Sequence, residues 1–342
     1  MPADDSEAAA PEVLAEGIAE ATNQPLSEPL VSVIVPTYDR PEWLRVTLDS
    51  VVGQTYRNIE IIVADDGPNP ATAEVVKSYN DPRIRYERHD GGIDMLQNSA
   101  LAYSKATGTL VAGVHDDDVW HPQFLEKCVA PFIESPDLDL VFCDVWVIDN
   151  AGDVLTEESD QGSERYGRAS LQPGRHQPWL DLAFEGTPPM IIGIVARNGV
   201  ADWLNFPTEA TYTFDRWYAY VLARRGGAAW YVDERLVYSR DSGENSTALL
   251  PLRWAVAGGW CHERFLEDDA LAPARPLLKK KAAEYRTIEA LVQLRAGETK
   301  AARRAAWRAV RPRPSVRSLG ALGASLVPRR FLPERFKASS PS

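Results

Sequence analysis

One stretch decides how this chain folds: Leu110-Val111-Ala112-Gly113-Val114-His115-Asp116-Asp117-Asp118-Val119-Trp120. Its apolar first half follows Gly108 and predicts a short buried strand, and Pro122 can open a helix just beyond it. The three carboxylates of the second half repel one another, so something must stabilise them. A hard divalent cation, Mg²⁺ or Mn²⁺, does this through carboxylate oxygens and keeps open positions for a substrate's phosphates. A solvated acidic turn is the alternative, and the triplet alone does not decide between the two.

The charge of the chain is unevenly distributed. The 342 residues are 44% hydrophobic, which allows one large domain with an appendage or two modest domains, and their net charge is −12. Residues 279–342 hold 16 Lys+Arg and 4 Asp+Glu, a net charge of +12, which leaves −24 for the rest of the chain. A basic tail on an acidic body suggests an anionic surface, a membrane or a nucleic acid, as the partner of the tail.

The cysteines and the leader indicate the compartment. Cys128, Cys143 and Cys261 are widely spaced and lack metal-ligand spacing, so we expect reduced thiols in a cytosolic protein. Residues 1–29 are acidic and Ala-rich, and we expect a disordered leader without the basic and apolar regions of a signal peptide. No run of about 18 apolar residues is present, so no membrane-spanning helix is expected.

Apolar runs alternate with helical periodicity through the first half of the chain. We expect strands at 31–35, 59–63, 83–86, 110–114 and 138–148, and helices at 42–52, 71–79, 94–106 and 122–133. Such apolar strands between helices predict an α/β fold with a mostly parallel sheet and helices on both faces. Ligands of these sheets bind beyond the carboxyl ends of strands. Three of those ends carry polar groups: Pro36-Thr37-Tyr38-Asp39, Asp65-Asp66-Gly67 and the stretch from His115 to Asp118.

The second half of the chain has a different composition. Residues 149–188 are rich in Gly, Ser, Glu, Gln and Pro and predict a long loop. Strands at 190–195 and 229–232, a helix at 213–225 and a helical region from residue 252 onward are expected beyond it.

The order and spacing of several motifs resemble the family 2 glycosyltransferases over about residues 31–246. The motifs are Val31-Ser32-Val33-Ile34-Val35-Pro36-Thr37-Tyr38-Asp39-Arg40, Leu48-Asp49-Ser50-Val51-Val52-Gly53-Gln54-Thr55-Tyr56, Ile61-Ile62-Val63-Ala64-Asp65-Asp66-Gly67, Gln97-Asn98, Ala106-Thr107-Gly108, the acidic triplet with Trp120 and Pro122, and Phe214-Asp215-Arg216-Trp217 ahead of Ala223-Arg224-Arg225-Gly226. The resemblance implies a GT-A fold, a Rossmann-like mixed sheet flanked by helices, and inverting transfer from a nucleotide sugar. It also implies a catalytic domain over 30–250, with a donor half at 30–148 and an acceptor half at 149–250, followed by a basic helical extension at 251–342.

The resemblance implies roles for residues of the donor pocket. Pro36, Thr37, Tyr38 and Asp39 line the nucleotide pocket, and Asp66 accepts the ring N–H of the base, although Asp-Gly pairs also favour plain turns. Asp65 has no clear role beyond capping the next helix. Gln97 and Asn98 contact the donor, where Asp90-Gly91-Gly92 and Gln97 replace the family's more usual Asn and Arg.

The acidic triplet looks like the family's metal and ribose motif, its DXD motif. Counted back from Pro122, Asp117 and Asp118 match the consecutive carboxylates, and His115 stands where the first Asp often stands. The resemblance implies that Asp116 contacts the ribose, and that Asp117 binds a Mg²⁺ or Mn²⁺ ion on the diphosphate with Asp118 in support. His115 either donates to a phosphate, caps the strand or is simply packed.

Asp215 lies where the family carries its general base, and Phe214 replaces the Glu that often precedes it. An Asp in the first turn of a helix can also serve only the helix dipole. Arg240 matches a position that contacts the diphosphate, with a structural ion pair as the alternative, and Ser242 replaces the His that often follows.

The basic tail predicts short amphipathic helices. Trp307, Leu319, Leu322 and Leu326 would face an apolar layer with Arg residues at the headgroups, or the helices would pack on the catalytic domain. Because polymer-building relatives act on lipid-linked acceptors, the resemblance favours peripheral binding of a cytoplasmic protein to the inner face of the plasma membrane. A nucleic-acid partner is not expected, because no recognised binding motif accompanies the charge.

We therefore expect an inverting hexosyltransferase that acts on a nucleoside-diphosphate sugar and a hydroxyl acceptor, which is a glycan, a lipid-linked molecule or a small molecule. A sugar-nucleotide pyrophosphorylase would need a Gly-rich basic signature after the first strand, where this chain has Pro36-Thr37-Tyr38-Asp39-Arg40. A non-catalytic nucleotide-sugar-binding relative is the remaining alternative, because of Phe214 and Ser242.

Overall fold

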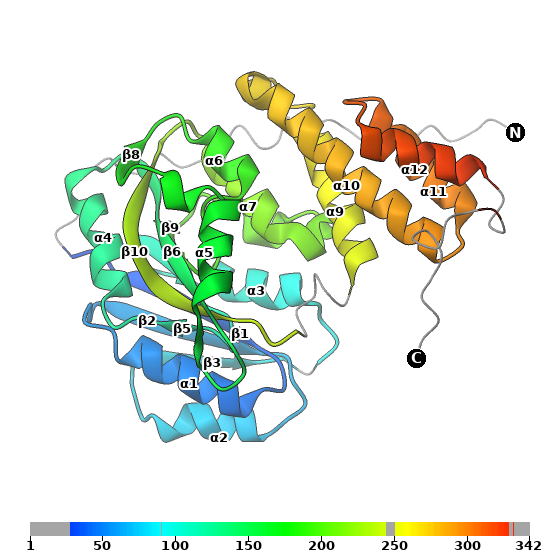
Figure 1. Ribbon diagram of the computed structural model, residues 1–342. Coiled ribbons are helices and arrows are strands. Elements are labelled where there is room, and N and C mark those ends of the chain that lie inside the picture. Colours follow the sequence, from blue (N-terminus) through cyan, green and yellow to red (C-terminus); the bar gives the residue numbers. More distant parts are fainter. Residues whose placement is uncertain (1–27, 90, 244–249, 328–330, 332–342) are drawn as a thin grey trace, which may run out of the picture.

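The computed structural model describes residues 28–89, 91–243 and 250–327 and Phe331. Its centre is a ten-stranded sheet with the order β3-β2-β1-β4-β9-β6-β10-β5, to which β7 and β8 add at β6 and β10 (Figure 1). The strands are β1 (Val31–Thr37), β2 (Ile59–Asp65), β3 (Ile84–Arg88), β4 (Leu110–Gly113), β5 (Val119–Trp120), β6 (Leu138–Ile148), β7 (Val154–Leu155), β8 (Gly174–His176), β9 (Ile194–Arg197) and β10 (Ala228–Arg240).

Helices cover both faces of the sheet. They are α1 (Pro41–Val52), α2 (Ala71–Ser78), α3 (Met95–Ser104), α4 (Phe124–Glu134), α5 (Thr156–Arg165), α6 (Leu180–Glu185) and α7 (Phe214–Ala223), with 3₁₀ turns η2 (Arg168–Ser170), η3 (Trp203–Asn205) and η4 (Thr208–Thr213). Alternate residues of each strand enter two core layers: Val33 and Ile61 pack with α1 and α4, whereas Ile34 and Ile62 pack with α3 and α7. Figure 1 shows α1 and α2 on one side of the sheet and α3 on the other.

The parallel strands bring the predicted site residues to one edge. β1 pairs in parallel with β2 and β4, and β2 pairs in parallel with β3. Thr37 lies opposite Asp65, and Ile34 lies opposite Gly113. The polar segments that follow β1, β2 and β4 therefore leave the sheet side by side, as the sequence predicts.

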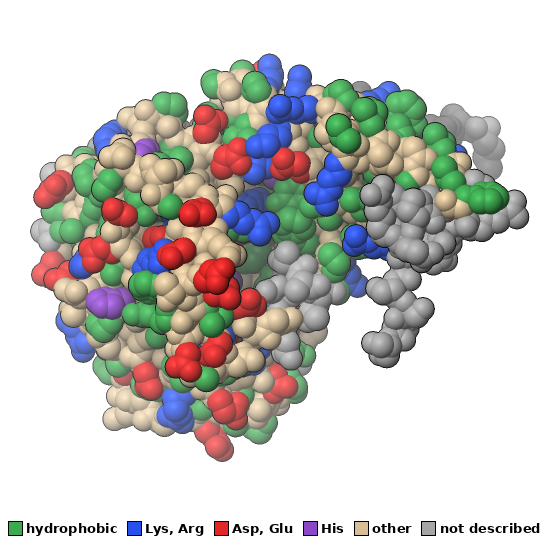
Figure 2. Space-filling model, viewed as in Figure 1, with side chains coloured by type: hydrophobic (Ala, Val, Ile, Leu, Met, Phe, Trp, Pro, Cys, Tyr) green, Lys and Arg blue, Asp and Glu red, His purple; other side chains and the backbone are tan. Residues whose placement is uncertain are grey.

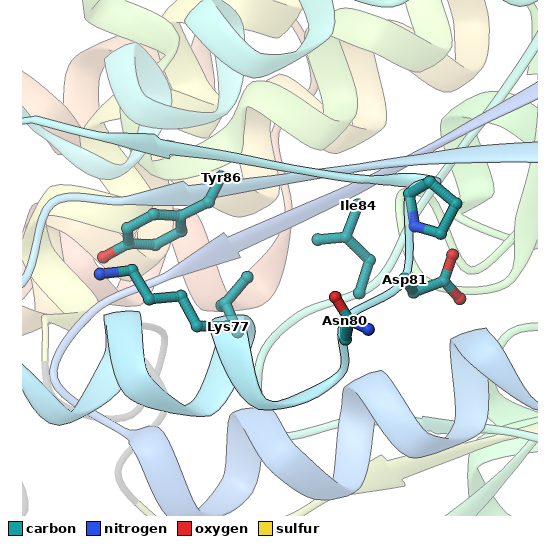
Figure 3. A pocket seen from close by; sticks show the side chains of 7 residues that line it. Lys77, Asn80, Asp81, Ile84 and Tyr86 are labelled. Atoms are coloured by element: carbon teal, nitrogen blue, oxygen red, sulfur yellow. The ribbon is translucent and has the colours of Figure 1, made fainter.

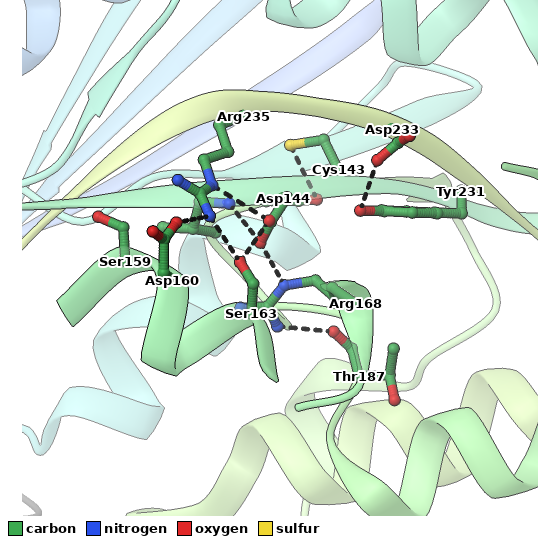
Figure 4. A network of polar contacts seen from close by, with 12 residues as sticks. Cys143, Asp144, Ser159, Asp160, Ser163, Arg168, Thr187, Tyr231, Asp233 and Arg235 are labelled. Carbon is green, nitrogen blue, oxygen red and sulfur yellow. Dashed lines mark hydrogen bonds and ion pairs between the residues drawn. The ribbon is translucent and has the colours of Figure 1, made fainter. Parts of the chain in front are cut away.

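The prediction of a long loop at 149–188 is wrong. This segment forms β7, α5, η2, β8 and α6. An apolar stripe is missing from α5, where only Ser159 and Ser163 are buried, so hydrophobic periodicity cannot reveal the helix. Polar contacts hold α5 and the turn after it in place instead. Asp144 of β6 accepts hydrogen bonds from Ser163, from Arg168 Nε (2.5 Å) and from Arg235 Nε (3.3 Å) (Figure 4).

The predicted strand at 190–195 also differs from the structure. Strand β9 begins only at Ile194 and runs antiparallel between β4 and β6. The residues before it form turns in which Ile191 has a φ of 77°, a left-handed conformation that apolar composition does not reveal.

The C-terminal extension is helical, with α9 (Pro251–Phe265), η5 (Asp269–Ala274), α10 (Arg275–Arg295), α11 (Thr299–Val310) and α12 (Val316–Leu326). An apolar cluster packs Phe265 and Leu278 of the extension against Phe184 and Ala210 of the sheet domain. Beyond that cluster, α11 and α12 pack on α10 through small residues and lie at the far end of the extension (Figure 1). Within the described residues, no helix is both long and apolar enough to cross a bilayer.

Candidate functional site

The first carboxylate of the triplet is held at the end of β1. Asp116 Oδ2 accepts hydrogen bonds from Thr37 Oγ1 (2.8 Å) and from the backbone N–H of Tyr38 (3.1 Å). Burial raises the pKa of Asp116 to about 6, since these two bonds and Arg40 only partly offset the loss of solvent and the neighbouring charge of Asp117. The structure thus brings together the predicted nucleotide-pocket residues of β1 and the predicted ribose contact.

Asp117 has a different partner. Its Oδ2 accepts a hydrogen bond from Arg40 Nη1 at 2.8 Å, and the same nitrogen lies 3.6 Å from Asp116 Oδ1. Burial and the adjacent Asp118 raise the pKa of Asp117, against the opposing effect of His115 and Arg40. Arg40 was not assigned a role from the sequence, although it closes the first motif, because its reach across to the triplet depends on the fold.

Asp118 anchors the acidic loop to the rest of the sheet. Its Oδ1 accepts from the backbone N–H of Arg240 (2.9 Å), and its carbonyl accepts from Thr47 Oγ1 (2.7 Å). Its Oδ2 lies 3.4 Å from His115 Nδ1. Burial disfavours the imidazolium, but the hydrogen bond and charge of Asp118 outweigh it, so the pKa of His115 is raised.

A set of possible metal ligands results from this arrangement. One ligand atom each from His115, Asp117 and Asp118 lie within 4.8 Å of one another. Two carboxylate oxygens and one imidazole nitrogen suit Mn²⁺, and the carboxylates suit Mg²⁺, with further positions left for water or phosphate oxygens. The donor set therefore fits the predicted ion, and Asp117 and Asp118 are the side chains that would hold it, with His115 beside them.

The two aspartates at the end of β2 differ in their hydrogen-bond partners. Asp65 is satisfied within the protein, because its Oδ1 accepts from Gly67 N (2.8 Å) and its Oδ2 from Tyr86 Oη (2.6 Å). Asp66 is also buried, yet its Oδ1 has no hydrogen-bond partner among the described residues. A buried acceptor without a partner costs free energy unless a ligand satisfies it, so Asp66 is the free acceptor at this strand end.

The helix that follows offers a second free acceptor. Asn98 of α3 donates to the carbonyl of Ala64 (3.0 Å), while its buried Oδ1 has no partner in the described part of the chain. Gln97 is exposed and completes a capping box with Asp94. Its side-chain Oε1 accepts a hydrogen bond from the backbone N–H of Asp94 at 3.3 Å. The geometry thus gives Gln97 a local structural use, and its contact with a donor stays a prediction.

The backbones that follow β1 and β2 pack tightly against each other. A Cβ atom on Gly67 would lie 2.5 Å from the backbone nitrogen of Asp39, so only glycine fits. Asp39 has a φ of 57°, and Pro36 precedes the polar turn. Tyr38 is 61% exposed and projects from this turn.

Arg240 spans the ends of β6 and β10. Its Nε donates to the carbonyl of Asp117 (3.0 Å) and its Nη1 to the carbonyl of Asp149 (2.6 Å). Its guanidinium lies 5.5 Å from the centre of the Trp43 ring, which also faces Arg40 at 5.2 Å. Arg240 thus binds the carbonyl of Asp117 in the acidic loop and the carbonyl of Asp149 just after β6, and its contact with the diphosphate stays a prediction.

Asp215 lies in the first turn of α7, and its side chain is 36% exposed. Its Oδ2 is 3.5 Å from Arg216 Nε, and the Arg216 guanidinium packs so closely on Gly186 that a Cβ there would be 2.3 Å from Nη1. Burial raises the pKa of Tyr285 of α10 to about 12, against the opposing charge of Arg216. Among the described residues, no hydrogen bond or ion pair joins Asp215 to the acidic triplet.

A separate cavity is not part of this site. It has a volume of about 380 Å³ and lies between α2 and the start of β3 (Figure 3). Its lining residues are Val76, Lys77, Asn80, Asp81, Pro82, Ile84 and Tyr86, none of which was predicted to bind a ligand.

Comparison with known proteins identifies the fold and the family. Residues 32–181 match the model of Glycosyl transferase family 2. An uncharacterized glycosyltransferase of Rickettsia typhi is 28% identical over 226 residues, which cover 65% of this chain and 67% of that protein. The chain therefore carries a family 2 glycosyltransferase domain over residues 32–181. An uncharacterized glycosyltransferase of Methanocaldococcus jannaschii is 32% identical over 136 residues, so the chain spans 47% of that relative.

Solved structures of other proteins share the fold. The crystal structure of TarS 1-349 from S. aureus has a TM-score of 0.63 at 17% identity and covers 83% of this chain and 81% of its own. A mannosyltransferase from Pyrobaculum calidifontis, solved with GDP-Man and Mn²⁺, has a TM-score of 0.54 at 17% identity and covers 90% of this chain and 83% of its own. The predicted GT-A fold with a C-terminal helical extension is confirmed, and the family 2 domain and the glycosyltransferase relatives identify the chain as a transferase enzyme.

Proposed function

We propose that this protein transfers a sugar from a nucleoside-diphosphate donor to a hydroxyl acceptor with inversion at the anomeric carbon. The observation that carries the proposal is the meeting of three strand ends, where Thr37 and Tyr38 hold Asp116 beside the possible metal ligands His115, Asp117 and Asp118. One of the solved neighbours was determined with UDP-GlcNAc and another with GDP-Man and Mn²⁺, which supports a nucleotide-sugar donor and leaves the base open.

The donor half provides acceptors and charge for a nucleotide. Asp66 Oδ1 and Asn98 Oδ1 are buried acceptors with no partner in the described part of the chain, and they suit the N–H groups of a base. Asp116 has a second carboxylate oxygen for a ribose hydroxyl. A divalent ion held by Asp117 and Asp118 would neutralise charge on the leaving diphosphate.

We assign Asp215 the role of general base. Its carboxylate takes the proton of the acceptor hydroxyl while that oxygen bonds to the anomeric carbon, and the bond to the diphosphate oxygen breaks on the opposite face. Arg216 lies beside Asp215 and orients it, because the guanidinium is itself fixed by close packing on Gly186. Phe214 is buried in the core, so the position before the base is a packing position in this chain.

Two variants separate the steps of the proposal. Asp117→Ala should abolish the Mn²⁺-dependent part of donor binding, measured by thermal shift against a panel of nucleoside diphosphates and their sugars. Asp215→Asn should retain that shift and lower turnover about 10²- to 10⁴-fold, the usual contribution of a general base. Asp181→Asn is the matched control, since Asp181 is an exposed aspartate in the first turn of α6.

The readout of turnover is release of the nucleoside diphosphate, with slow donor hydrolysis as the reaction when no acceptor is supplied. If Asp117→Ala and Asp215→Asn both keep the activity of the unaltered protein, the proposed mechanism is wrong. If only the nucleotides of one base raise the melting temperature, that base identifies the donor class. The acceptor class we propose is a glycan, a lipid-linked molecule or a small metabolite, and the setting is the cytoplasm at the inner face of the plasma membrane.

A further inference from the structure

The outer face of α12 is apolar, and no part of the chain that the structure describes covers it. Val316, Leu319 and Leu326 are 92%, 51% and 60% exposed, and their spacing puts them with the exposed Gly320 and Gly323 on one face of the helix. The opposite face is buried through Ser318, Ala321 and Ser325. Because no charged side chain interrupts the stripe, α12 has the form of an amphipathic helix whose apolar face points outward.

The exposed face of α11, the helix that packs against α12, is basic and aromatic. Lys300, Arg304, Trp307 and Arg311 follow one another at helical spacing and are all exposed, Trp307 by 54%. Among the described residues, Arg304 and Arg311 form no ion pair, whereas Arg308 pairs with Glu263. Trp307, Arg308 and Arg311 line a shallow hollow of about 260 Å³. Unpaired guanidinium groups beside an aromatic ring suit a phosphate-bearing headgroup.

The two faces belong to one rigid unit. Arg303 of α11 donates to the carbonyl of Ser325 (2.9 Å), and alanines of both helices form a shared core that includes Ala306 and Ala321. Figure 2 shows acidic side chains spread over the sheet domain and hydrophobic side chains gathered at the end formed by α11 and α12. An anionic surface would repel the acidic body and attract this end, which fixes the orientation of the molecule.

We propose that the α11–α12 pair docks on an anionic lipid bilayer. The apolar stripe of α12 enters the boundary between headgroups and acyl chains, and Trp307, Arg304 and Arg311 lie among the headgroup phosphates. A second copy of the chain fits this surface less well, because a two-fold contact through α12 would bring the arginines flanking each copy together. The inference rests on the helical extension alone and does not depend on the proposed transferase mechanism.

Vesicle co-sedimentation of the full chain tests the proposal. We expect binding to vesicles of phosphatidylcholine with phosphatidylglycerol, weak binding to phosphatidylcholine alone, and release from the anionic vesicles as salt is raised. The pair Leu319→Ser with Leu326→Ser should weaken binding at least about tenfold, and Arg304→Gln with Arg311→Gln about 25-fold, since each basic residue contributes about fivefold.

Val154→Ser with Leu204→Ser is the matched control, because both side chains are exposed apolar residues of the sheet domain. This control pair should bind as the unaltered chain does. Equal binding to neutral and anionic vesicles, no binding at all, or unchanged binding of the Leu319/Leu326 pair would each overturn the proposal. Light scattering tests the alternative of self-association. If the unaltered chain is a dimer, the Leu319→Ser/Leu326→Ser variant is a monomer and neither binds vesicles, the surface is a contact between two copies of the chain instead.

Discussion

Replacing Asp144 should destabilise the protein more than any other single change at an ion pair of the sheet domain. Asp144 is the common partner of two arginines: Arg168 from the segment after α5 and Arg235 from β10 (Figure 4). Arg168 is 6% exposed, and without Asp144 it keeps the carbonyl of Thr187 (2.9 Å) and a place 5.4 Å from the centre of the Tyr166 ring, with no other carboxylate paired to it among the described residues. Arg235 keeps its pair with Asp160 (2.7 Å) and its place over the Trp146 ring.

The magnitude follows from this asymmetry. A buried cation that loses its partner costs about 3–5 kcal/mol, and nearly all of that cost falls on Arg168. Asp160 is 59% exposed, so Asp160→Ala should cost less than about 1 kcal/mol, the usual range for a surface pair. The double variant Asp144→Ala with Arg168→Met should recover part of the loss, because it removes the stranded charge as well as its partner.

The assay is equilibrium unfolding in urea at neutral pH, followed by tryptophan fluorescence. If Asp144→Ala and Asp160→Ala have the same midpoint, or if the double variant is no more stable than Asp144→Ala, the reasoning is refuted. The same carboxylate predicts a pH dependence. Hydrogen bonds from Ser163 and Arg168 overcome burial and lower the pKa of Asp144. Its stabilising effect is therefore complete above the unfolded-state pKa of about 3.9 and is lost as pH falls through the lower folded value, a loss that Asp144→Asn should not show.

Two further pairs of changes test the packing of the extension and the end of β2. Gly258→Ala places a Cβ 2.2 Å from Tyr285 and should cost about 1–3 kcal/mol, whereas Gly320→Ala on the open face of α12 should raise stability by about 0.5–1 kcal/mol, both measured by thermal unfolding. Asp65→Ala should lower the melting temperature, because it removes two hydrogen-bond acceptors that the protein uses. Asp66→Ala should leave the melting temperature unchanged or higher and still weaken nucleotide binding at least about tenfold; equal loss of stability in both aspartate variants would contradict the separation of their roles.

The strands were the most predictable part of the fold. β6 runs over the predicted residues 138–148, and β1 and β2 begin at the predicted residues 31 and 59 and continue two residues beyond the predicted ends. Buried parallel strands need apolar side chains on both faces, and this requirement leaves an unbroken apolar run in the sequence. The same regularity predicts that the three polar strand ends lie side by side, as they do in the structure.

The parts that escaped prediction are held by contacts between distant residues. α5 has no apolar stripe, and it is fixed by Asp144, which comes 19 residues before Ser163. The pair Gly258-Gly259 marks the place where α9 and α10 approach closely, since Tyr285 and Arg286 cover the two glycines. Neither contact has a local signature, because charge pairs and close approaches depend on which segments the fold brings together.

The three carboxylates of the triplet differ in what the protein already does with them. Asp116 and Asp118 are fixed by hydrogen bonds that include the backbone N–H groups of Tyr38 and Arg240, so neither can move without disturbing a strand end. Asp117 is held chiefly by Arg40, whose side chain is 36% exposed and can swing away. We therefore expect a cation to exchange with Arg40 at Asp117, because that exchange breaks no backbone hydrogen bond and frees a guanidinium for a phosphate. On this reasoning the acidic loop is stable without a metal, and its middle carboxylate is the one kept available for a ligand.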